Sequence, residues 1–276
     1  NIESGWGDCY LCAGVESMSR VKRRGCNWSP HPGLELDWPE AYVTMGQTAE
    51  NIADNWEIGR AEQQIFALES HIKATNALEE GRFNDEIIPV IDGETIIEVD
   101  GCIRPDSTLD AMSKLNPVFS ENGTVTAATS SPLTDGAVAM IICSEEFASD
   151  RGLNPMARIV SGAVSGCPPG IMGIGPVEAT RKVLERTGWN SESIDLYEIN
   201  EAFSSQSLAV ISELGLEASK INIDGGAIAL GHPLGASGAR ITGKAASLLR
   251  RTNSKRAIAT MCIGGGMGIA IALETP

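Results

Sequence analysis

From residue 155 to the C-terminus, short apolar runs alternate with longer amphipathic stretches, and this alternation constrains the fold more than any other feature. The short runs predict strands, and the longer stretches predict helices that begin or end at proline or glycine. The resulting order, β-α-β-α-β-α-β-β, is that of one α/β domain. Strands are predicted at 157–164, 194–199, 221–223, 257–263 and 268–273, and helices at 176–188, 201–214 and 235–251.

The first half of the chain predicts pieces of a second domain. Strands are expected at 8–14 and 137–143, and the second is almost wholly apolar, which predicts a buried strand. A short helix is expected at 145–151. These pieces give a partial first domain at 1–19 and 135–154, followed by a C-terminal domain at 155–276.

The segment 20–134 between these pieces is rich in glycine and proline and predicts an inserted loop domain. A helix at 48–56 is expected to begin at the N-cap Thr48. A longer helix is expected at 60–80, with Ile65, Leu68 and Ile72 as its apolar stripe and Gly59 as N-cap. Short strands are expected at 87–90 and 95–99.

Charge and composition exclude several kinds of partner. The net charge of −15 disfavours nucleic acid, because a phosphate backbone would be repelled. No apolar run approaches the roughly 20 residues that span a bilayer, so no membrane partner is predicted. An anionic ligand would need a local basic patch, for which Lys22-Arg23-Arg24 and Arg104 are candidates, although surface charge explains them equally well.

The seven cysteines are odd in number and show no disulfide-framework spacing. This predicts free thiols in a reducing compartment, and we expect a cytoplasmic protein. Cys9 and Cys12 form a Cys-x-x-Cys pair, but no second pair or nearby histidine completes a metal site. The sequence therefore predicts no metal.

His232, one of three histidines, lies in a glycine-rich turn between a predicted strand and a predicted helix. This position is the carboxyl edge of a sheet, where α/β proteins bind ligands. An imidazole there can move a proton near neutral pH. Taken alone, a histidine in such a turn is more often structural.

Two neighbouring strand ends carry further reactive groups. Asn200 follows the strand at 194–199, and Cys262 lies at the end of the strand at 257–263. We expect both to meet His232 at one edge of the sheet. Cys262 could then be a nucleophile or an acid/base that ionises near neutral pH, and the backbone N–H of Gly264 could stabilise an oxyanion. Alone, Cys262 is explained as a small buried residue and Asn200 as a helix N-cap.

Three blocks resemble the signature motifs of thiolases, the acetyl-CoA acetyltransferases and 3-ketoacyl-CoA thiolases. They are Asn-Glu-Ala-Phe at 200–203, the glycine-rich run at 225–240 and Cys-Ile-Gly-Gly-Gly-Met-Gly at 262–268. Shorter stretches agree, and the similarity covers essentially the whole chain. These stretches lie at 15–19, 45–51, 103–105, 123–127 and 172–176.

The resemblance implies a five-layered α-β-α-β-α fold of two similar domains, with a loop domain inserted in the first and, commonly, a homodimer or homotetramer. It also implies a nucleophilic cysteine in a Cys-Gly-Ser-Gly-like turn shortly before the strand at 8–14. No such turn occurs in the sequence. Because the first residue is Asn1 rather than Met, we expect that turn to lie upstream of this chain, and we expect the 276-residue chain alone to be inactive.

The activity implied is that of an acyl-CoA C-acyltransferase, with coenzyme A as substrate or product rather than as a cofactor. By resemblance, His232 activates the nucleophilic thiol, Cys262 moves the proton on the acetyl carbanion, Asn200 holds a water in one oxyanion hole, and Gly264 contributes to another. The residues implied for binding CoA are Ser131, Arg104, Leu115, Phe119, Met172 and Phe203.

Two details bear on the direction of the reaction. Thr44 stands where biosynthetic thiolases often carry a histidine, and the Thr129-Ser130-Ser131 run favours 3-ketoacyl-CoA degradation. The alternative function is that of a non-catalytic thiolase-like protein that binds acyl-CoA without turnover. A ketoacyl synthase, which makes carbon–carbon bonds without a second cysteine, is disfavoured by Cys262.

Overall fold

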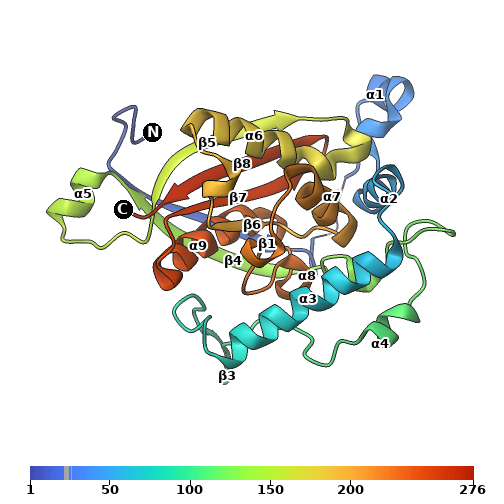
Figure 1. The fold of residues 1–276 in the computed structure, drawn as a ribbon, viewed down its shortest axis with the longest axis horizontal. Coiled ribbons are helices and arrows are strands. Elements are labelled where there is room, and N and C mark those ends of the chain that lie inside the picture. Colours follow the sequence, from blue (N-terminus) through green and yellow to red (C-terminus); the bar gives the residue numbers. More distant parts are fainter. Residues whose placement is uncertain (22–24, 26) are drawn as a thin grey trace.

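A computed structural model describes residues 1–21, 25 and 27–276 and shows a mixed α/β fold (Figure 1). The candidate basic patch Lys22-Arg23-Arg24 lies outside the described residues. The remaining chain forms a four-stranded sheet, a long two-stranded ribbon, a small hairpin and the helices around them. No helix in the described ranges is long and apolar enough to cross a membrane.

The four-stranded sheet forms the centre of the C-terminal domain. Its strand order is β5 (Arg158–Gly166), β8 (Met267–Glu274), β7 (Arg256–Ile263) and β6 (Leu196–Ile199). Strands β6 and β7 are parallel, so both end at the same edge, while β8 is antiparallel to β7 and β5. This is the edge at which the sequence predicted a site.

Helices cover both faces of this sheet. Side chains of α6 (Gly175–Thr187) and α7 (Ser204–Leu214) pack with Tyr197, Ile199 and Ile258 on one face. Those of α9 (Leu234–Thr252) pack with Leu196 and Ala259 on the other. The alternation of side chains along β6 thus supplies two apolar surfaces, as expected for a strand buried on both sides.

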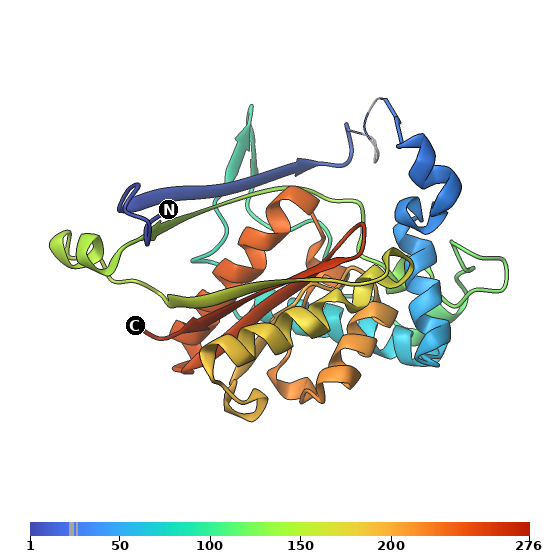
Figure 2. The same ribbon diagram turned by 90° about the horizontal axis from the view of Figure 1, so that it is seen from above.

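A ribbon of two long antiparallel strands lies on the outer side of α9 (Figure 2). It consists of β1 (Cys9–Ser17) and β4 (Asp135–Cys143), which correspond to the strands expected at 8–14 and 137–143. The helices α6 and α7, the four-stranded sheet, α9 and the ribbon form four successive layers. The expected thiolase-like fold has five. The prediction that 137–143 is buried was wrong, because the outward face of the ribbon, including Ile141, is exposed.

The segment between β1 and β4 wraps along one side of the sheet edge. Its two main helices, α2 and α3, are linked by a short turn and were expected at nearly these positions. The elements are α1 (Pro32–Asp37), η1 (Pro39–Tyr42), α2 (Met45–Asn55), α3 (Arg60–Glu79), β2 (Val90–Asp92), β3 (Thr95–Ile97), α4 (Leu109–Ser113) and η2 (Ala127–Thr129). The other short elements are α5 (Glu145–Asp150), η3 (Pro169–Ile174), η4 (Ser191–Ser193), η5 (Ala218–Lys220) and α8 (Ala227–Leu230).

Two predictions about the helices of this segment are wrong. The N-cap of α2 is Thr44, whose hydroxyl accepts from the Gln47 N–H, whereas Thr48 is buried inside the helix. The expected apolar stripe of α3 is largely outside, because Ile65 and Ile72 are each about half exposed. The helix instead buries small and polar residues, namely Gln63, Gln64, Ala67, Ser70, His71, Ala74 and Ala77.

The strand expected at 221–223 is not a strand. Only Ile221 forms an isolated bridge, parallel to Tyr197 of β6. The strand expected at 87–90 lies slightly later, as β2, and pairs with β3 in a hairpin whose residues are all exposed.

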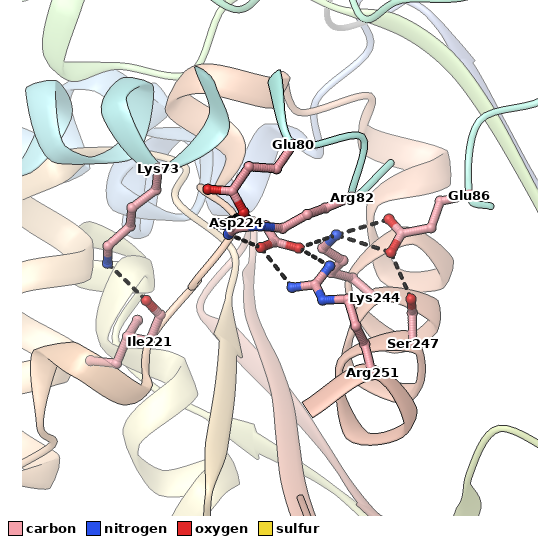
Figure 3. A network of polar contacts seen from close by, with 9 residues as sticks. All are labelled: Lys73, Glu80, Arg82, Glu86, Ile221, Asp224, Lys244, Ser247 and Arg251. Carbon is pink, nitrogen blue, oxygen red and sulfur yellow. Dashed lines mark hydrogen bonds and ion pairs between the residues drawn. The ribbon is translucent and has the colours of Figure 1, made fainter. Parts of the chain in front are cut away.

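A network of charged groups joins the segment 20–134 to the C-terminal domain (Figure 3). The fully buried Asp224 carboxylate lies 2.7 Å from Lys244 Nζ, 2.7 Å from Arg251 Nη1 and 3.0 Å from Arg82 Nη1. Lys244 also pairs with Glu86 at 2.9 Å. Asp224 directly precedes the glycine-rich turn that carries His232, so this network anchors the start of that turn.

Candidate active site

Asn200 and His232 meet, as the sequence predicted. Strand β6 ends at Ile199, and the Asn200 N–H continues the ladder by donating to the Thr260 carbonyl on β7 at 3.0 Å. The Asn200 side chain is fully buried, and its Nδ2 lies 3.3 Å from His232 Nε2. Two residues 32 positions apart are therefore joined at the sheet edge.

The other ring nitrogen of His232 is held by a residue that the sequence analysis did not single out. His232 Nδ1 lies 2.6 Å from Ser237 Oγ, and Ser237 donates its own proton to the Pro233 carbonyl at 3.0 Å. The serine oxygen is therefore the acceptor for an Nδ1–H. In the neutral imidazole the lone pair is then on Nε2, which faces the Asn200 amide.

The backbone of His232 is also fixed. Its N–H donates to Thr134 Oγ1 at 3.1 Å, and Thr134 donates to the Pro132 carbonyl at 2.7 Å. Thr134 comes from the loop before β4, far away in sequence. Neither Ser237 nor Thr134 had a sequence signal beyond lying in or near a recognised block, because hydroxyl groups are common at turns.

Asn200 Oδ1 has no hydrogen-bond partner among the described residues, although it is buried. A buried carbonyl oxygen without a partner is unfavourable by about 1–3 kcal/mol. A bound water or substrate group beside His232 would satisfy this oxygen.

Cys262 lies near the end of β7, which neighbours β6, and it is 5% exposed. It packs in an apolar cluster with Met172 and Phe203. Burial, with a smaller contribution from the nearby Cys167, raises the pKa of Cys262 to about 12. The expectation that this thiol ionises near neutral pH is therefore wrong, because burial disfavours the thiolate.

Three of the residues implied for CoA binding belong to the same cluster as Cys262. Met172 and Phe203 are buried in it, and Phe119 packs edge-on against Phe203 with ring centroids 5.9 Å apart. Gly46 of α2 permits this packing, because a Cβ there would overlap the Phe119 ring. Ser131 is tied to this region through its N–H, which donates to the Ala202 carbonyl at 3.0 Å.

The other two implied residues are held by α3. The Arg104 N–H donates to Nδ1 of the buried His71 at 3.3 Å, and the Arg104 side chain is exposed. The Leu115 carbonyl accepts from the Arg60 guanidinium at the start of α3, and its side chain is 38% exposed. These hydrogen bonds place Arg104 and Leu115 along α3 rather than in the buried cluster around Cys262. Gly264 lies in the exposed turn between β7 and β8.

Comparison with known protein families gives matches along nearly the whole chain. Residues 1–146 match the thiolase N-terminal domain, and residues 153–275 match the thiolase C-terminal domain. Among curated relatives, the acetyl-CoA acetyltransferase of Paracoccus denitrificans is 50% identical over 84% of this chain and 60% of its own length. The 3-ketoacyl-CoA thiolase of Bacillus subtilis is 43% identical over 97% of this chain and 72% of its own length.

Solved structures agree with these matches. Human mitochondrial 3-ketoacyl-CoA thiolase in complex with CoA has a TM-score of 0.90 at 42% identity, covering 100% of this chain and 73% of that protein. The dimeric peroxisomal thiolase of Saccharomyces cerevisiae has a TM-score of 0.93 at 38% identity, covering 100% and 71%. The chain therefore belongs to the thiolase family and has the thiolase fold. It spans 60% of the length of the acetyl-CoA acetyltransferases it matches.

Proposed function

We propose that this chain is part of an acyl-CoA C-acyltransferase that cleaves 3-ketoacyl-CoA by thiolysis or condenses acetyl-CoA. The observation that carries the proposal is the contact between Asn200 Nδ2 and His232 Nε2, in a ring whose other nitrogen is held by Ser237. Family membership supports the same reaction class.

His232 has the role of activating the nucleophilic thiol. With Nδ1–H bonded to Ser237, Nε2 accepts the thiol proton, and the resulting Nε2–H then donates to the thioester oxygen. The orphaned Asn200 Oδ1 holds a water, which supplies a second donor to that oxygen. The nucleophilic thiol attacks the 3-keto carbon and forms the acyl-enzyme thioester as the carbon–carbon bond breaks.

Cys262 acts as the acid of this step. Because burial raises its pKa to about 12, the thiol is protonated at neutral pH and can deliver its proton to the leaving acetyl-CoA carbanion. In the synthetic direction the same sulfur removes that proton. We assign the backbone N–H of Gly264 to a second oxyanion hole at the 3-keto oxygen, where negative charge develops as the thiol attacks.

Coenzyme A and acyl-CoA are the proposed ligands, with Met172, Phe119 and Phe203 against the pantetheine arm beside Cys262. Ser131, Arg104 and Leu115 are assigned to the outer part of the same ligand. The human relative was solved in complex with CoA, and the yeast relative is a dimer. We propose the same ligand and a homodimer or homotetramer here. A cytoplasmic location is supported by the free thiols of all six described cysteines.

We further propose that the nucleophilic cysteine belongs to sequence outside this chain. Cys9, Cys12 and Cys143 lie on the β1–β4 ribbon, and neither these nor the other cysteines sit in a Cys-Gly-Ser-Gly-like turn. We also propose that the chain consists of a partial first domain at 1–19 and 135–154, a loop domain at 20–134 and a C-terminal domain at 155–276.

The test is the complete protein, produced with its upstream coding sequence, assayed for thiolysis of acetoacetyl-CoA and for its synthesis. Cys262→Ala should abolish both directions, because the proton on the carbanion then has no carrier. Cys9→Ala, on the exposed ribbon, is the matched control and should retain parental rates. A Cys262→Ala variant with parental rates would remove the acid/base assignment. CoA binding without turnover in the unmodified complete protein would favour the non-catalytic alternative.

A further inference from the structure

The side chain of Asn222 takes the place of a strand beside β6. After the bridge at Ile221 the chain turns away, and Asn222 adopts a φ of 43°, in the left-handed region. Its Oδ1 accepts from the Ile199 N–H at 2.9 Å, and its Nδ2 donates to the Ile199 carbonyl at 2.8 Å. One amide group thus pairs with both backbone groups of the residue before Asn200, as a neighbouring strand would.

Glu201 follows Asn200 directly and fixes it from the other side. Its carboxylate is 2% exposed and accepts from three donors on different segments. These are Asn222 Nδ2 at 2.8 Å, Ser70 Oγ of α3 at 2.7 Å and the Ile228 N–H of α8 at 3.1 Å. A carboxylate with only donors around it is acting as an acceptor, and its removal would leave three buried donors unsatisfied.

The carboxylate also makes close contact with the turn that leads to His232. A Cβ at Gly226 would overlap the Glu201 carboxyl group, so only glycine permits this approach. The Gly226 N–H donates to Ser70 Oγ at 3.1 Å, which itself donates to Glu201. Glu201 therefore links the end of β6 to the beginning of the segment that ends at His232.

We propose that Asn222 and Glu201 are positioning residues that keep Asn200 within hydrogen-bonding distance of His232. The expected effect on turnover rests on the proposed acyl-transfer function. The geometry from which the positioning role is inferred does not depend on that function. Asn222 holds the backbone before Asn200, and Glu201 holds the backbone after it together with the 226–228 segment. Displacing either side chain lengthens the contact of 3.3 Å between Asn200 Nδ2 and His232 Nε2.

The first experiment measures the histidine ring itself. The 276-residue chain has three histidines, so ¹⁵N-histidine labelling gives few signals, and His232→Gln identifies those of His232. Asn222→Asp keeps the acceptor toward Ile199 but removes both donors, and Glu201→Gln replaces one acceptor oxygen by a donor. In each we expect the tautomer ratio of His232 to change by at least about threefold, as the loss of one hydrogen bond implies.

Tyr197→Phe is the matched control, because it also removes one hydrogen bond from β6, to the Ser191 carbonyl at 3.2 Å, at the other end of the strand. It should leave the ratio unchanged. Ser70→Ala removes one donor to Glu201 and gives a milder variant, should Asn222→Asp or Glu201→Gln fail to fold. The proposal would be overturned if the tautomer ratio were unchanged in every variant among Asn222→Asp, Glu201→Gln and Ser70→Ala that folds. It would also be overturned if Tyr197→Phe changed the ratio as much as they do.

The second experiment uses the complete protein and separates kcat from KM. A positioning defect should lower kcat at least about tenfold in Glu201→Gln while KM for acyl-CoA stays within about twofold. Parental kcat in that variant would contradict the inference. If the unmodified complete protein shows no turnover but the tautomer changes above are observed, the proposed function is rejected and the positioning role stands.

Discussion

Glu198 is a carboxyl group in an environment that favours its neutral form. It lies on β6, two residues before Asn200, it is 2% exposed, and its Oε1 has no partner among the described residues. Burial raises its pKa from 4.5 to about 8, and the opposing charges of Lys244 and Arg240 do not compensate. In the folded protein this group therefore holds its proton at neutral pH.

The stability of the protein should consequently fall at alkaline pH through Glu198. Because the folded pKa is above the unfolded one, this contribution is full below about pH 4.5 and is lost as pH rises toward 8, by about 1.4 kcal/mol per pH unit. Glu198→Gln should thus have a higher Tm than the parent at about pH 8.5 and a smaller advantage at about pH 5. Thermal melts at the two pH values measure this difference, and identical pH profiles would contradict it.

The contact between Asn200 and His232 was predictable from the sequence, whereas the residues that hold these two side chains were not. Asn200 and His232 each follow a predicted strand, so their contact could be expected. The second of these strands is reduced to the parallel bridge at Ile221, which still runs beside β6. The hydrogen bond to Thr134 depends on how a distant loop folds over the turn, and the contact with Ser237 depends on how α9 begins after Pro233. The pKa of Cys262 depends on burial by Met172 and Phe203, which the strand pattern does not report.

At the scale of elements, the charged network around Asp224 holds α9 and the 20–134 segment together (Figure 3). Burial by itself would raise the pKa of Asp224, but hydrogen bonds from Arg251, Lys244 and Arg82 lower it to about 2. A carboxylate with a depressed pKa stabilises the fold above its unfolded pKa and loses this contribution as pH falls toward about 2.

Asp224→Ala should therefore lower the free energy of unfolding by about 3–5 kcal/mol at neutral pH, because it leaves Lys244 and two arginines beside an empty buried site. The control is Asp110→Ala, which breaks the exposed pair with Lys114 at 2.6 Å and should change stability by less than about 1 kcal/mol. Urea unfolding of both variants at pH 7 and about pH 3 measures the effects. Equal losses in the two variants would exclude the network as an anchor.

The positions of the helices and strands could be predicted from the sequence more closely than which of their faces is buried. The periodicity of 60–80 placed α3 within one residue, since its glycine N-cap and Glu62 mark the start. The buried face was misassigned because α3 packs through Ala67, Ala74 and polar residues against the His232 turn and leaves Ile65 partly outside. The apolar run at 221–223 was too short to distinguish a strand from one bridge followed by the Asn222 side chain.

At the scale of the whole molecule, the β1–β4 ribbon has one face against α9 and one face in solvent. Leu11 and Ile141 are cross-strand partners on the outward face and are 73% and 67% exposed, and Val15 is 72% exposed. In the described chain β1 pairs only with β4, so its other edge presents free backbone groups. An apolar face beside an open edge strand promotes association with other chains.

We therefore expect the isolated 276-residue chain to self-associate through this ribbon, with an apparent mass that rises with concentration in sedimentation or light-scattering measurements. Replacing both cross-strand partners, Leu11→Lys and Ile141→Lys, should shift the chain toward monomer, because two charges on the face oppose its burial. The control is Leu36→Lys, at a residue that is 82% exposed on α1 and away from the ribbon, which should leave self-association unchanged. A parent chain that stays monomeric at high concentration would contradict the expectation. Equal dispersal by the Leu36→Lys control would show that added charge, rather than this face, governs association.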